Sequence, residues 1–227
     1  MPPPMGPTVL STTAGDLDLH AYHVRIDDRA FSILHTGALL SYEEERGFLE
    51  EQRLPYGVML WPGAIALAHE IASRPFAGKR VLEIGAGTGL PGIVAAARGA
   101  RVVQTDRQSL ALHVCKMNAE RNQLTTIEHR QADWAAWDDD TAYDVILGSD
   151  VLYAETMHPQ LRHIFETNLA PGGAILVSDP FRKTSVELLE RMEADGWRVT
   201  MNKWTVGTTG PARPCGVFEV TRGDQAG

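Results

Sequence analysis

The stretch VLEIGAGTGLPGIV, residues 81–94, joins a short apolar run to three closely spaced glycines. The apolar residues predict a buried strand, which is followed directly by Gly85, Gly87 and Gly89. Because glycine has no Cβ, the backbone can turn sharply at these positions and a ligand can approach it closely. A helix that begins near Gly89, with Pro91 in its first turn, points free N–H groups at such a ligand. We therefore expect a strand, a ligand-binding loop and a helix in succession.

The spacing of the glycines separates this loop from a nicotinamide-binding loop. The dinucleotide fingerprint is G-x-G-x-x-G, and its third glycine would fall where Leu90 stands. Glu83 lies just ahead of the loop, and an acidic residue at the loop mouth favours a ligand with a positive or amphoteric end. S-adenosylmethionine has such an end, which carries an α-ammonium group and a sulfonium. The loop therefore favours S-adenosylmethionine as the cofactor and disfavours a nicotinamide dehydrogenase.

Downstream of the loop, strand-like and helix-like segments alternate. Strands are expected at 80–84, 101–105, 126–131, 143–148 and 174–178, and helices near 89–98, 109–122, 158–169 and 184–195. This alternation predicts a doubly wound, Rossmann-like α/β sheet, mostly parallel and covered by helices on both faces. The chain closes with two consecutive strand-like runs, WRVTMNKWTV and CGVFEVTR, which we expect to pair antiparallel at the sheet edge.

The segment upstream of the loop predicts an addition to this core. LDLHAYHVRI and FSILHTGALL alternate on both sides of the turn-like DDRA, a pattern typical of a β-hairpin. GAIALAHEIAS has helical periodicity and follows Pro62, which suits a first helical turn. We expect a disordered, proline-rich start over residues 1–12, a hairpin and connecting segment over 13–60, and one α/β domain over 61–222.

Acidic residues follow two further strands of the predicted sheet. Asp106 comes directly after the second strand and 106 − 85 = 21 residues beyond Gly85, close to the spacing of about 20 at which an acid hydrogen-bonds ribose hydroxyls. QADW follows the third strand, so that Asp133 can accept from an adenine amino group and Trp134 can border the base. An acid at a strand end is also an ordinary helix cap, and Asp133 alone is open to that interpretation.

The segment ILGSDVLYAETMHP follows the fourth strand, again at a carboxyl end, where open α/β sheets bind ligands. It places Asp150 and Tyr153 beside the predicted cofactor crevice. Asp150 can orient an amine and accept its proton, and Tyr153 can line the path of a cation. The alternative is that Asp150 caps a short helical turn and Tyr153 only packs. SDPFR, residues 178–182, either borders the cleft or simply connects the fifth strand to a helix.

These motifs together resemble the seven-β-strand (class I) S-adenosylmethionine-dependent methyltransferases. More narrowly, the chain resembles the family-16 group, which contains many protein lysine methyltransferases. That group carries an acid-x-x-aromatic signature after the fourth strand, matched by Asp150-Val-Leu-Tyr153, and a Trp-Pro-x segment before the first core helix, matched by Trp61-Pro62-Gly63. The resemblance covers about residues 54–181. The N-terminal hairpin and the acidic YEEERGFLEEQ depart from the pattern and are expected to set substrate identity.

The resemblance implies S-adenosylmethionine as the cofactor and assigns a role to each matching residue. The glycine loop with Glu83 would line the methionine end, Asp106 would bind ribose, Asp133 and Trp134 would bind the adenine end, and Trp61 would border the entrance. The expected cofactor-binding residues are Trp61, Glu83, Gly85, Gly87, Thr88, Gly89, Asp106, Asp133, Trp134 and Ser149. Asp150 and Tyr153 would face the methyl acceptor as catalytic residues.

The composition of the chain limits the kinds of partner, metal site and compartment that we expect for it. Lys and Arg total 21 against 29 Asp and Glu, a formal charge of −8, which argues against a general binder of nucleic acid or of an anionic membrane. The two cysteines are too few for a disulfide framework, and the histidines show no ligand set with a carboxylate, so no metal site is expected. No apolar run approaches the about 18 residues of a membrane helix, and the start lacks a signal-peptide pattern. These features favour the cytoplasm.

The leading hypothesis is an S-adenosylmethionine-dependent methyltransferase that acts on a protein lysine side chain. A small-molecule N-methyltransferase is the alternative, because a recessed acceptor pocket in a compact chain would suit a metabolite amine. A module that binds S-adenosylmethionine without turnover is a third hypothesis. It is opposed by the presence of the glycine loop together with Asp150 and Tyr153.

Overall fold

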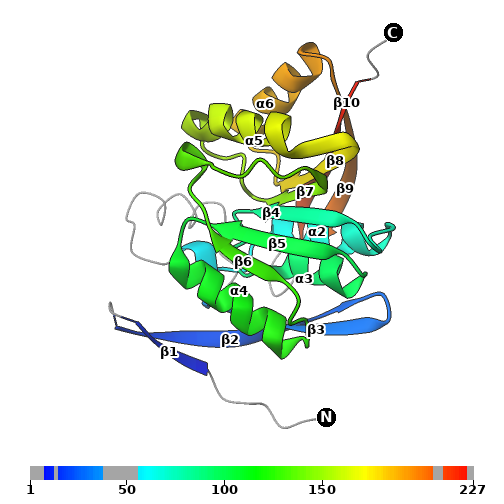
Figure 1. Cartoon of the computed structure of the whole chain (residues 1–227). Coiled ribbons are helices and arrows are strands. Elements are labelled where there is room, and N and C mark those ends of the chain that lie inside the picture. Colours follow the sequence, from blue (N-terminus) through cyan, green and yellow to red (C-terminus); the bar gives the residue numbers. More distant parts are fainter. Residues whose placement is uncertain (1–7, 13–14, 38–55, 207–211, 224–227) are drawn as a thin grey trace.

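The computed structural model describes residues 8–12, 15–37, 56–206 and 212–223. Its central sheet contains seven strands: β4 (Arg80–Ile84), β5 (Arg101–Asp106), β6 (Glu128–Gln131), β7 (Tyr143–Ser149), β8 (Leu169–Asp179), β9 (Trp197–Val206) and β10 (Arg213–Arg222). In space they follow the order β6-β5-β4-β7-β8-β10-β9 (Figure 1). The strands from β6 to β8 are parallel, whereas β10 runs antiparallel to both β8 and β9. The predicted sheet and its antiparallel terminal pair are confirmed.

Helices cover both faces of this sheet (Figure 1). They are α2 (Pro62–Ala72), α3 (Leu90–Ala97), α4 (Ser109–Arg121), α5 (His158–Asn168) and α6 (Lys183–Ala194). Side chains of a strand alternate between the two faces, and β4 shows this directly. Val81 packs into the core that contains residues of α2, α3 and α4, while Leu82 and Ile84 pack into the core that contains residues of α5 and α6.

The N-terminal addition is a three-stranded antiparallel sheet of β1 (Thr8–Thr12), β2 (Gly15–Ile26) and β3 (Arg29–His35). The predicted hairpin is present as β2 and β3. Residues 8–12, which the sequence places in a disordered start, instead form β1 and pair with β2 from Thr8–Leu19 to Thr12–Gly15. The reason is that β2 begins at Gly15, and its residues 15–19 are available to pair with β1. The threonine and valine residues of β1 suit a strand.

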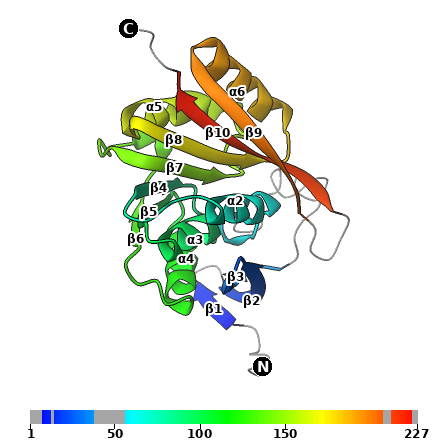
Figure 2. The same ribbon diagram turned by 90° about the vertical axis from the view of Figure 1, so that its right-hand side faces the viewer.

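Asn118 of α4 and Asn122, the C-cap residue of that helix, bind this small sheet to the core. The Asn118 amide donates to Leu34 O (3.1 Å) and accepts from Leu34 N (2.7 Å). Asn122 repeats the arrangement one turn later with Ser32 N (3.0 Å) and Ser32 O (2.9 Å). Both amides therefore satisfy the backbone groups on the outer edge of β3. Figure 2 shows α2, α3 and α4 between the N-terminal sheet and the central sheet.

Several element boundaries differ from the expected ones. β8 begins at Leu169 rather than at residue 174, because Leu169 pairs with Tyr143 of β7 across an irregularity in the register. β6 begins at Glu128 rather than at residue 126. The acidic stretch YEEERGFLEEQ and the end of the predicted hairpin arm lie outside the described residues. Within the described part of the chain, no helix is long and apolar enough to cross a membrane.

Candidate functional site

A cavity of about 210 Å³ lies at the carboxyl ends of β4, β5 and β7. Three loops form much of its wall, because the carboxyl ends of neighbouring parallel strands meet at one edge of the sheet. Most of the site residues predicted from the sequence line this cavity, namely Trp61, Gly85, Gly87, Thr88, Asp106, Asp133, Trp134, Ser149, Asp150 and Tyr153.

The glycine loop presents bare backbone to the cavity. Gly85 and Gly87 have φ values of 59° and 56°, in the left-handed region that side chains rarely adopt. A Cβ on Gly85 would stand 3.0 Å from Val151 Cγ1 and 3.3 Å from Trp134 Cζ2, and a Cβ on Gly87 would stand 3.1 Å from Gly57 O. The loop therefore requires glycine for its conformation and for its close neighbours, which include the Trp134 indole.

Asp106, the last residue of β5, ties the glycine loop to the next strand. Its Oδ2 accepts from Gly87 N (3.1 Å) and its Oδ1 accepts from Gln108 N (2.9 Å). Burial raises the pKa of this carboxyl, although its backbone hydrogen bonds oppose the rise. Asp106 thus holds the loop in shape and also brings a hydrogen-bond acceptor to the cavity wall.

Asp133 is a helix cap that also lines the cavity. Its Oδ1 accepts from Ala135 N (3.0 Å), so it caps the short 3-10 helix η2 (Trp134–Ala136). It lines the cavity together with Trp134, which follows it. The cap fixes the first residue of η2, which is Trp134, and the Trp134 indole lies against Gly85 of the glycine loop.

Asp150 lies against the first turn of α2. It has a φ of 53°, and its N–H donates to Ser178 O (2.9 Å). A Cβ on Gly63 would overlap Asp150 Oδ2 and would stand 2.9 Å from Ser178 Oγ. The Trp-Pro-Gly segment and the Asp-x-x-Tyr segment, far apart in sequence, therefore meet in space, and Gly63 leaves the room that the Asp150 carboxylate fills.

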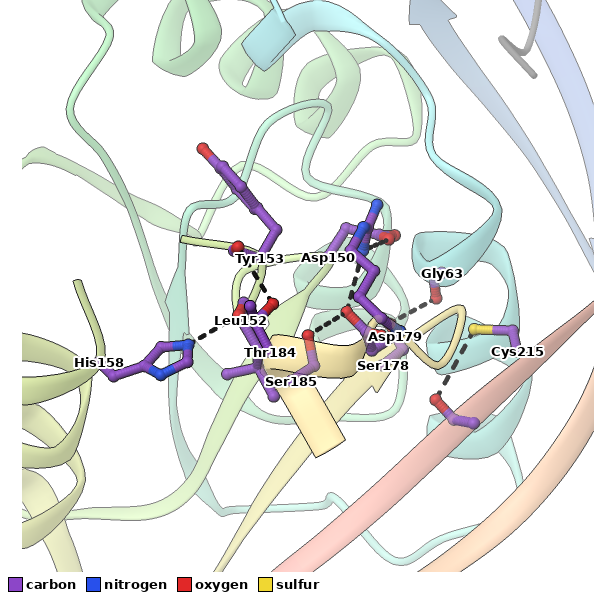
Figure 3. A network of polar contacts seen from close by, with 12 residues as sticks. Gly63, Asp150, Leu152, Tyr153, His158, Ser178, Asp179, Thr184, Ser185 and Cys215 are labelled. Atoms are coloured by element: carbon purple, nitrogen blue, oxygen red, sulfur yellow. Dashed lines mark hydrogen bonds and ion pairs between the residues drawn. The ribbon is translucent and has the colours of Figure 1, made fainter. Parts of the chain in front are cut away.

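Arg182 joins Asp150 to the end of β8, and Figure 3 shows Asp150, Asp179 and Ser185 in this network. Arg182 Nη1 lies 2.9 Å from Asp150 Oδ1 and 2.9 Å from Asp179 Oδ2. Asp179 also accepts from Ser185 Oγ (2.7 Å) and from Arg182 N (2.6 Å). Arg182 lines the cavity, so the SDPFR segment borders the cleft rather than only connecting a strand to a helix.

The loop between Asp150 and Tyr153 is held from outside the cavity as well (Figure 3). His158 Nε2 lies 2.8 Å from Leu152 O, and His158 Nδ1 lies 3.2 Å from Arg191 Nη2. Because arginine can only donate, Nδ1 is the acceptor and Nε2–H donates to Leu152 O. Tyr153 itself is 47% exposed, so it stands where the cavity opens to solvent.

Sequence comparison identifies the family of the chain. Residues 43–194 match the pattern of the lysine methyltransferase family. The chain belongs to this family. Membership makes the protein a methyltransferase with S-adenosylmethionine as its methyl donor, and it confirms the resemblance found in the sequence motifs.

Curated relatives carry two kinds of name. The chain is 33% identical over 150 residues to protein N-lysine methyltransferase METTL21A of Xenopus tropicalis, a match of 63% of this chain and 69% of the relative. It is 38% identical over 106 residues to histone-arginine methyltransferase METTL23 of Mus musculus. That match covers 43% of this chain and 42% of the relative, so the chain spans less than half of this second protein.

Solved structures share the fold. Precorrin-6y C5,15-methyltransferase from Geobacter metallireducens has a TM-score of 0.58 at 16% identity, over 70% of this chain and 86% of that chain. An O-methyltransferase from Bacillus cereus has a TM-score of 0.55 at 16% identity, over 79% of this chain and 90% of that chain. The lysine methyltransferase family member described here thus has the Rossmann-like methyltransferase fold that its sequence predicts.

The cavity suits the methyl donor of the family. Its lining includes the glycine loop, where backbone conformation and close neighbours exclude a side chain on Gly85 and Gly87. Its walls offer the Asp106 carboxylate as an acceptor for hydroxyl groups and the Trp134 indole as a flat apolar surface. These features suit a ligand chain that approaches the backbone closely, ribose hydroxyls and an adenine ring, so the residues present fit the nucleoside part of S-adenosylmethionine.

Two predicted residues lie elsewhere. Glu83 is fully buried under the first turn of α3, where its Oε2 accepts from Gly92 N (3.1 Å) and Gln104 Nε2 (2.6 Å). Gly89 is the N-cap residue of that helix, with a φ of 79°, and its O accepts from Gln104 Nε2 (2.8 Å). Among the described residues, the lining of the cavity includes neither of them.

The position of Glu83 follows from the pleat of β4. Val81 and Glu83 are two residues apart, so both point to the face that α3 covers. Burial raises the pKa of the Glu83 carboxyl to about 8, which keeps it mainly protonated at pH 7. The negative charge expected at the loop mouth is therefore not supplied by Glu83, and its role is to hold α3 against the loop.

The cavity contains further residues to which the sequence analysis assigns no definite role. They are Gly57, Met59, Ala64, Ala86, Arg107, Gln108, Val151, Met157 and Arg182. Five of the nine lie within two residues of a predicted one, namely Met59, Ala86, Arg107, Gln108 and Val151, so proximity in the sequence is a usable signal for them. Arg182 has a weaker signal, since it lies three residues beyond the end of β8.

Proposed function

We propose that this methyltransferase transfers a methyl group to the side-chain amine of a lysine in another protein. The observation that carries the proposal is one continuous cavity, lined at the same time by the glycine loop with Asp106 and by Asp150 with Tyr153. The relatives named as protein N-lysine methyltransferases support a lysine acceptor.

The mouth of the cavity supports an acceptor that enters from solvent. Tyr153 is 47% exposed there, and Trp61 and Met157 line the same cavity. Aromatic and thioether side chains suit the aliphatic stem of a lysine and, at an aromatic face, its cationic end. A protein side chain can therefore reach Asp150 while its backbone stays outside.

S-adenosylmethionine supplies a methyl group on a sulfonium: the amine lone pair forms an N–C bond as the S–C bond breaks, and the nitrogen then releases a proton. The chain's main contribution is to orient the two reactants, which saves up to about 7–11 kcal/mol of barrier in well-oriented reactions. A free lysine has a pKa of about 10.4, so the site must favour its neutral form. A narrow, partly apolar cavity does so by penalising the charge.

In this proposal Asp150 orients the amine. One of its oxygens is already bound to Arg182 (2.9 Å) and the other lies against Gly63. This arrangement fixes the direction of the carboxylate, which supports orientation as its first role and proton acceptance as its second.

The acceptor class can be decided with one labelling experiment. The protein is incubated with tritiated-methyl S-adenosylmethionine and cell lysate, the products are resolved by size, and labelled proteins are hydrolysed to amino acids. We expect label in protein, as methylated lysine. Label only in the small-molecule fraction would favour the metabolite alternative, label in methylarginine would favour an arginine acceptor, and no label at all would favour a binding module.

We further propose that the protein acts in the cytoplasm. Both cysteines, Cys115 and Cys215, are free and buried, and free thiols are typical of a reducing compartment. The charge of −8 disfavours nucleic acid and anionic membranes as partners. Fractionation of cells that express the tagged protein tests the location, and recovery with membranes would contradict it.

A further inference from the structure

Arg182 brings a permanent positive charge into the cavity, beside the residue that is proposed to orient the acceptor. Its side chain is 10% exposed, and the side chains of its two partners are 6% (Asp150) and 0% (Asp179) exposed. Arginine stays protonated at every accessible pH. Its charge therefore acts on the cavity whatever the state of the other groups.

The guanidinium is anchored independently of Asp150. The fully buried Asp179 carboxylate accepts three hydrogen bonds, from Arg182 Nη1 (2.9 Å), Arg182 N (2.6 Å) and Ser185 Oγ (2.7 Å). Three hydrogen bonds thus fix Asp179, and two of them fix Arg182 to it. When Asp150 engages an acceptor, the guanidinium has a second carboxylate that keeps it in place.

The backbone on both sides of this ion pair adopts an unfavourable conformation. Asp150 has a φ of 53°, and Phe181, directly before Arg182, has a φ of 66°. Residues other than glycine persist in this region only where their surroundings impose it, and such residues concentrate at functional sites. Phe181 is held by an edge-on contact with Phe218, with ring centroids 6.0 Å apart. The turns at Asp150 and Phe181 thereby place the side chains of Asp150 and Arg182 within contact of each other.

We infer that Arg182 is a positioning residue of the acceptor site, which offsets the charge of Asp150 so that an acceptor amine enters more readily in its uncharged, nucleophilic form. An isolated carboxylate beside the amine would favour the ammonium form, which has no lone pair to attack with. A guanidinium bound to the same carboxylate opposes this effect, although Asp179 shares its charge, and it leaves the Asp150 carboxylate in place to orient the amine. The inference rests on the proposed function, because it requires an acceptor that titrates.

Among the described residues, Arg182 forms an ion pair with Asp150, whereas Arg107 lines the same cavity beside Asp106. Burial raises the pKa of the Cys215 thiol to about 12, so it stays neutral, and α2 contributes the uncharged Gly63. The titratable and charged groups that face Asp150 or line the same cavity are Arg182, Asp179, Cys215, Tyr153, Asp106, Asp133 and Arg107.

The test is the pH dependence of kcat, since kcat reports the titration of groups in the bound complex. The acceptor is a peptide that spans the lysine labelled in lysate protein, used at saturation from pH 6 to pH 10. For Arg182→Gln we expect the midpoint of the rising limb to move up by about one pH unit or more, which lowers kcat at pH 7 roughly tenfold and leaves it near wild type at pH 10. Arg182→Lys keeps the charge and should keep the wild-type midpoint.

Arg162→Gln is the matched control, because Arg162 also pairs with acids, Asp195 (2.5 Å) and Glu166 (3.4 Å), but on α5 away from the cavity. Its profile should equal that of the wild type. A kcat that falls by the same factor at every pH in Arg182→Gln, or an unmoved midpoint, overturns the inference and leaves only a structural role for Arg182.

A second variant keeps the inference testable if Arg182→Gln does not fold, as judged by thermal melting and by calorimetry with S-adenosylmethionine. Asp150→Asn removes the carboxylate charge and leaves Arg182 in place, so its midpoint should move down; an upward or absent shift contradicts the inference. Failure of the proposed function is seen separately, because the wild type would then form no methylated lysine at all.

Discussion

Replacement of Gly63 by alanine tests whether the Trp-Pro-Gly segment serves the site or only the fold. The new Cβ would overlap Asp150 Oδ2 and stand 2.9 Å from both Asp150 Cγ and Ser178 Oγ. Ordinary carbon contacts are about 3.5–4.0 Å, and the overlap with Oδ2 is deeper than the contact with Cγ, so the carboxylate must move by roughly 1 Å. A misplacement of about 1 Å can lower a rate about 100-fold. We therefore expect kcat to fall about 10- to 100-fold.

The same substitution should have a modest effect on stability. Added volume in a packed site costs about 1–3 kcal/mol, and alanine is up to about 1 kcal/mol better than glycine inside a helix. A net loss of about 1–2 kcal/mol corresponds to about 2–8 °C in Tm for a chain of this size. Binding of S-adenosylmethionine, measured by calorimetry, should stay within about threefold of wild type, since the glycine loop is untouched.

Gly172→Ala is the control for this loss of stability. Gly172 has a φ of 73° and open space around its Cα, so a side chain there strains the backbone by about 1–2 kcal/mol at a distance from the cavity. The control should lose a similar amount of Tm and keep its kcat. A Gly63→Ala protein that turns over at the wild-type rate would refute the argument that Gly63 makes room for Asp150.

Three further predictions concern other parts of the site. Because burial raises the folded-state pKa of Glu83 to about 8, well above the ordinary value of about 4.3 for a glutamate, the folded state keeps a proton that the unfolded chain releases. Wild-type stability should therefore fall by up to about 1.4 kcal/mol per pH unit between about pH 5 and 8. For Glu83→Gln, which cannot ionise, the free energy of unfolding from denaturant titrations should fall less over this window. If the free energies of the variant and the wild type fall in parallel with pH, the raised pKa of Glu83 is contradicted. Trp134→Ala should weaken donor binding about tenfold or more, as seen by calorimetry, because the cavity loses its indole wall; unchanged affinity would remove Trp134 from the donor site. His158→Ala leaves Leu152 O without its donor (2.8 Å in the wild type) and should lower kcat more than donor affinity, whereas equal losses in both would indicate general destabilisation.

The central sheet could be predicted from the sequence because its local signals agree. The apolar residues of β4, the glycines after it and Pro91 at the start of α3 all indicate one strand–loop–helix unit. β8 was predicted too short, since Pro171 and Gly172 usually mark a turn. Here the pairing of Leu169 with Tyr143 extends the strand through them. The pairing partner, a tertiary feature, overrode the local signal.

The site could be predicted in part for a similar reason. Asp106 and Asp150 come at strand ends, and the parallel sheet brings those ends together whatever the details of packing. For Glu83 the order of residues is misleading, because it precedes the loop in sequence, whereas the pleat of β4 turns its side chain under α3. For Arg182 the sequence leaves the role open, because its contact with Asp150 depends on the backbone at Phe181, whose φ of 66° no sequence rule indicates for phenylalanine.

The central claim is that one cavity holds the methyl donor at the glycine loop and the acceptor lysine at Asp150. The most direct measurement is the initial rate at which Asp150→Ala and the wild type form tritiated methyl-lysine, with donor binding measured on the same samples. The account predicts that the variant binds S-adenosylmethionine as the wild type does and forms methyl-lysine at least about 100-fold more slowly. Normal donor binding together with a wild-type rate of methyl-lysine formation would contradict it.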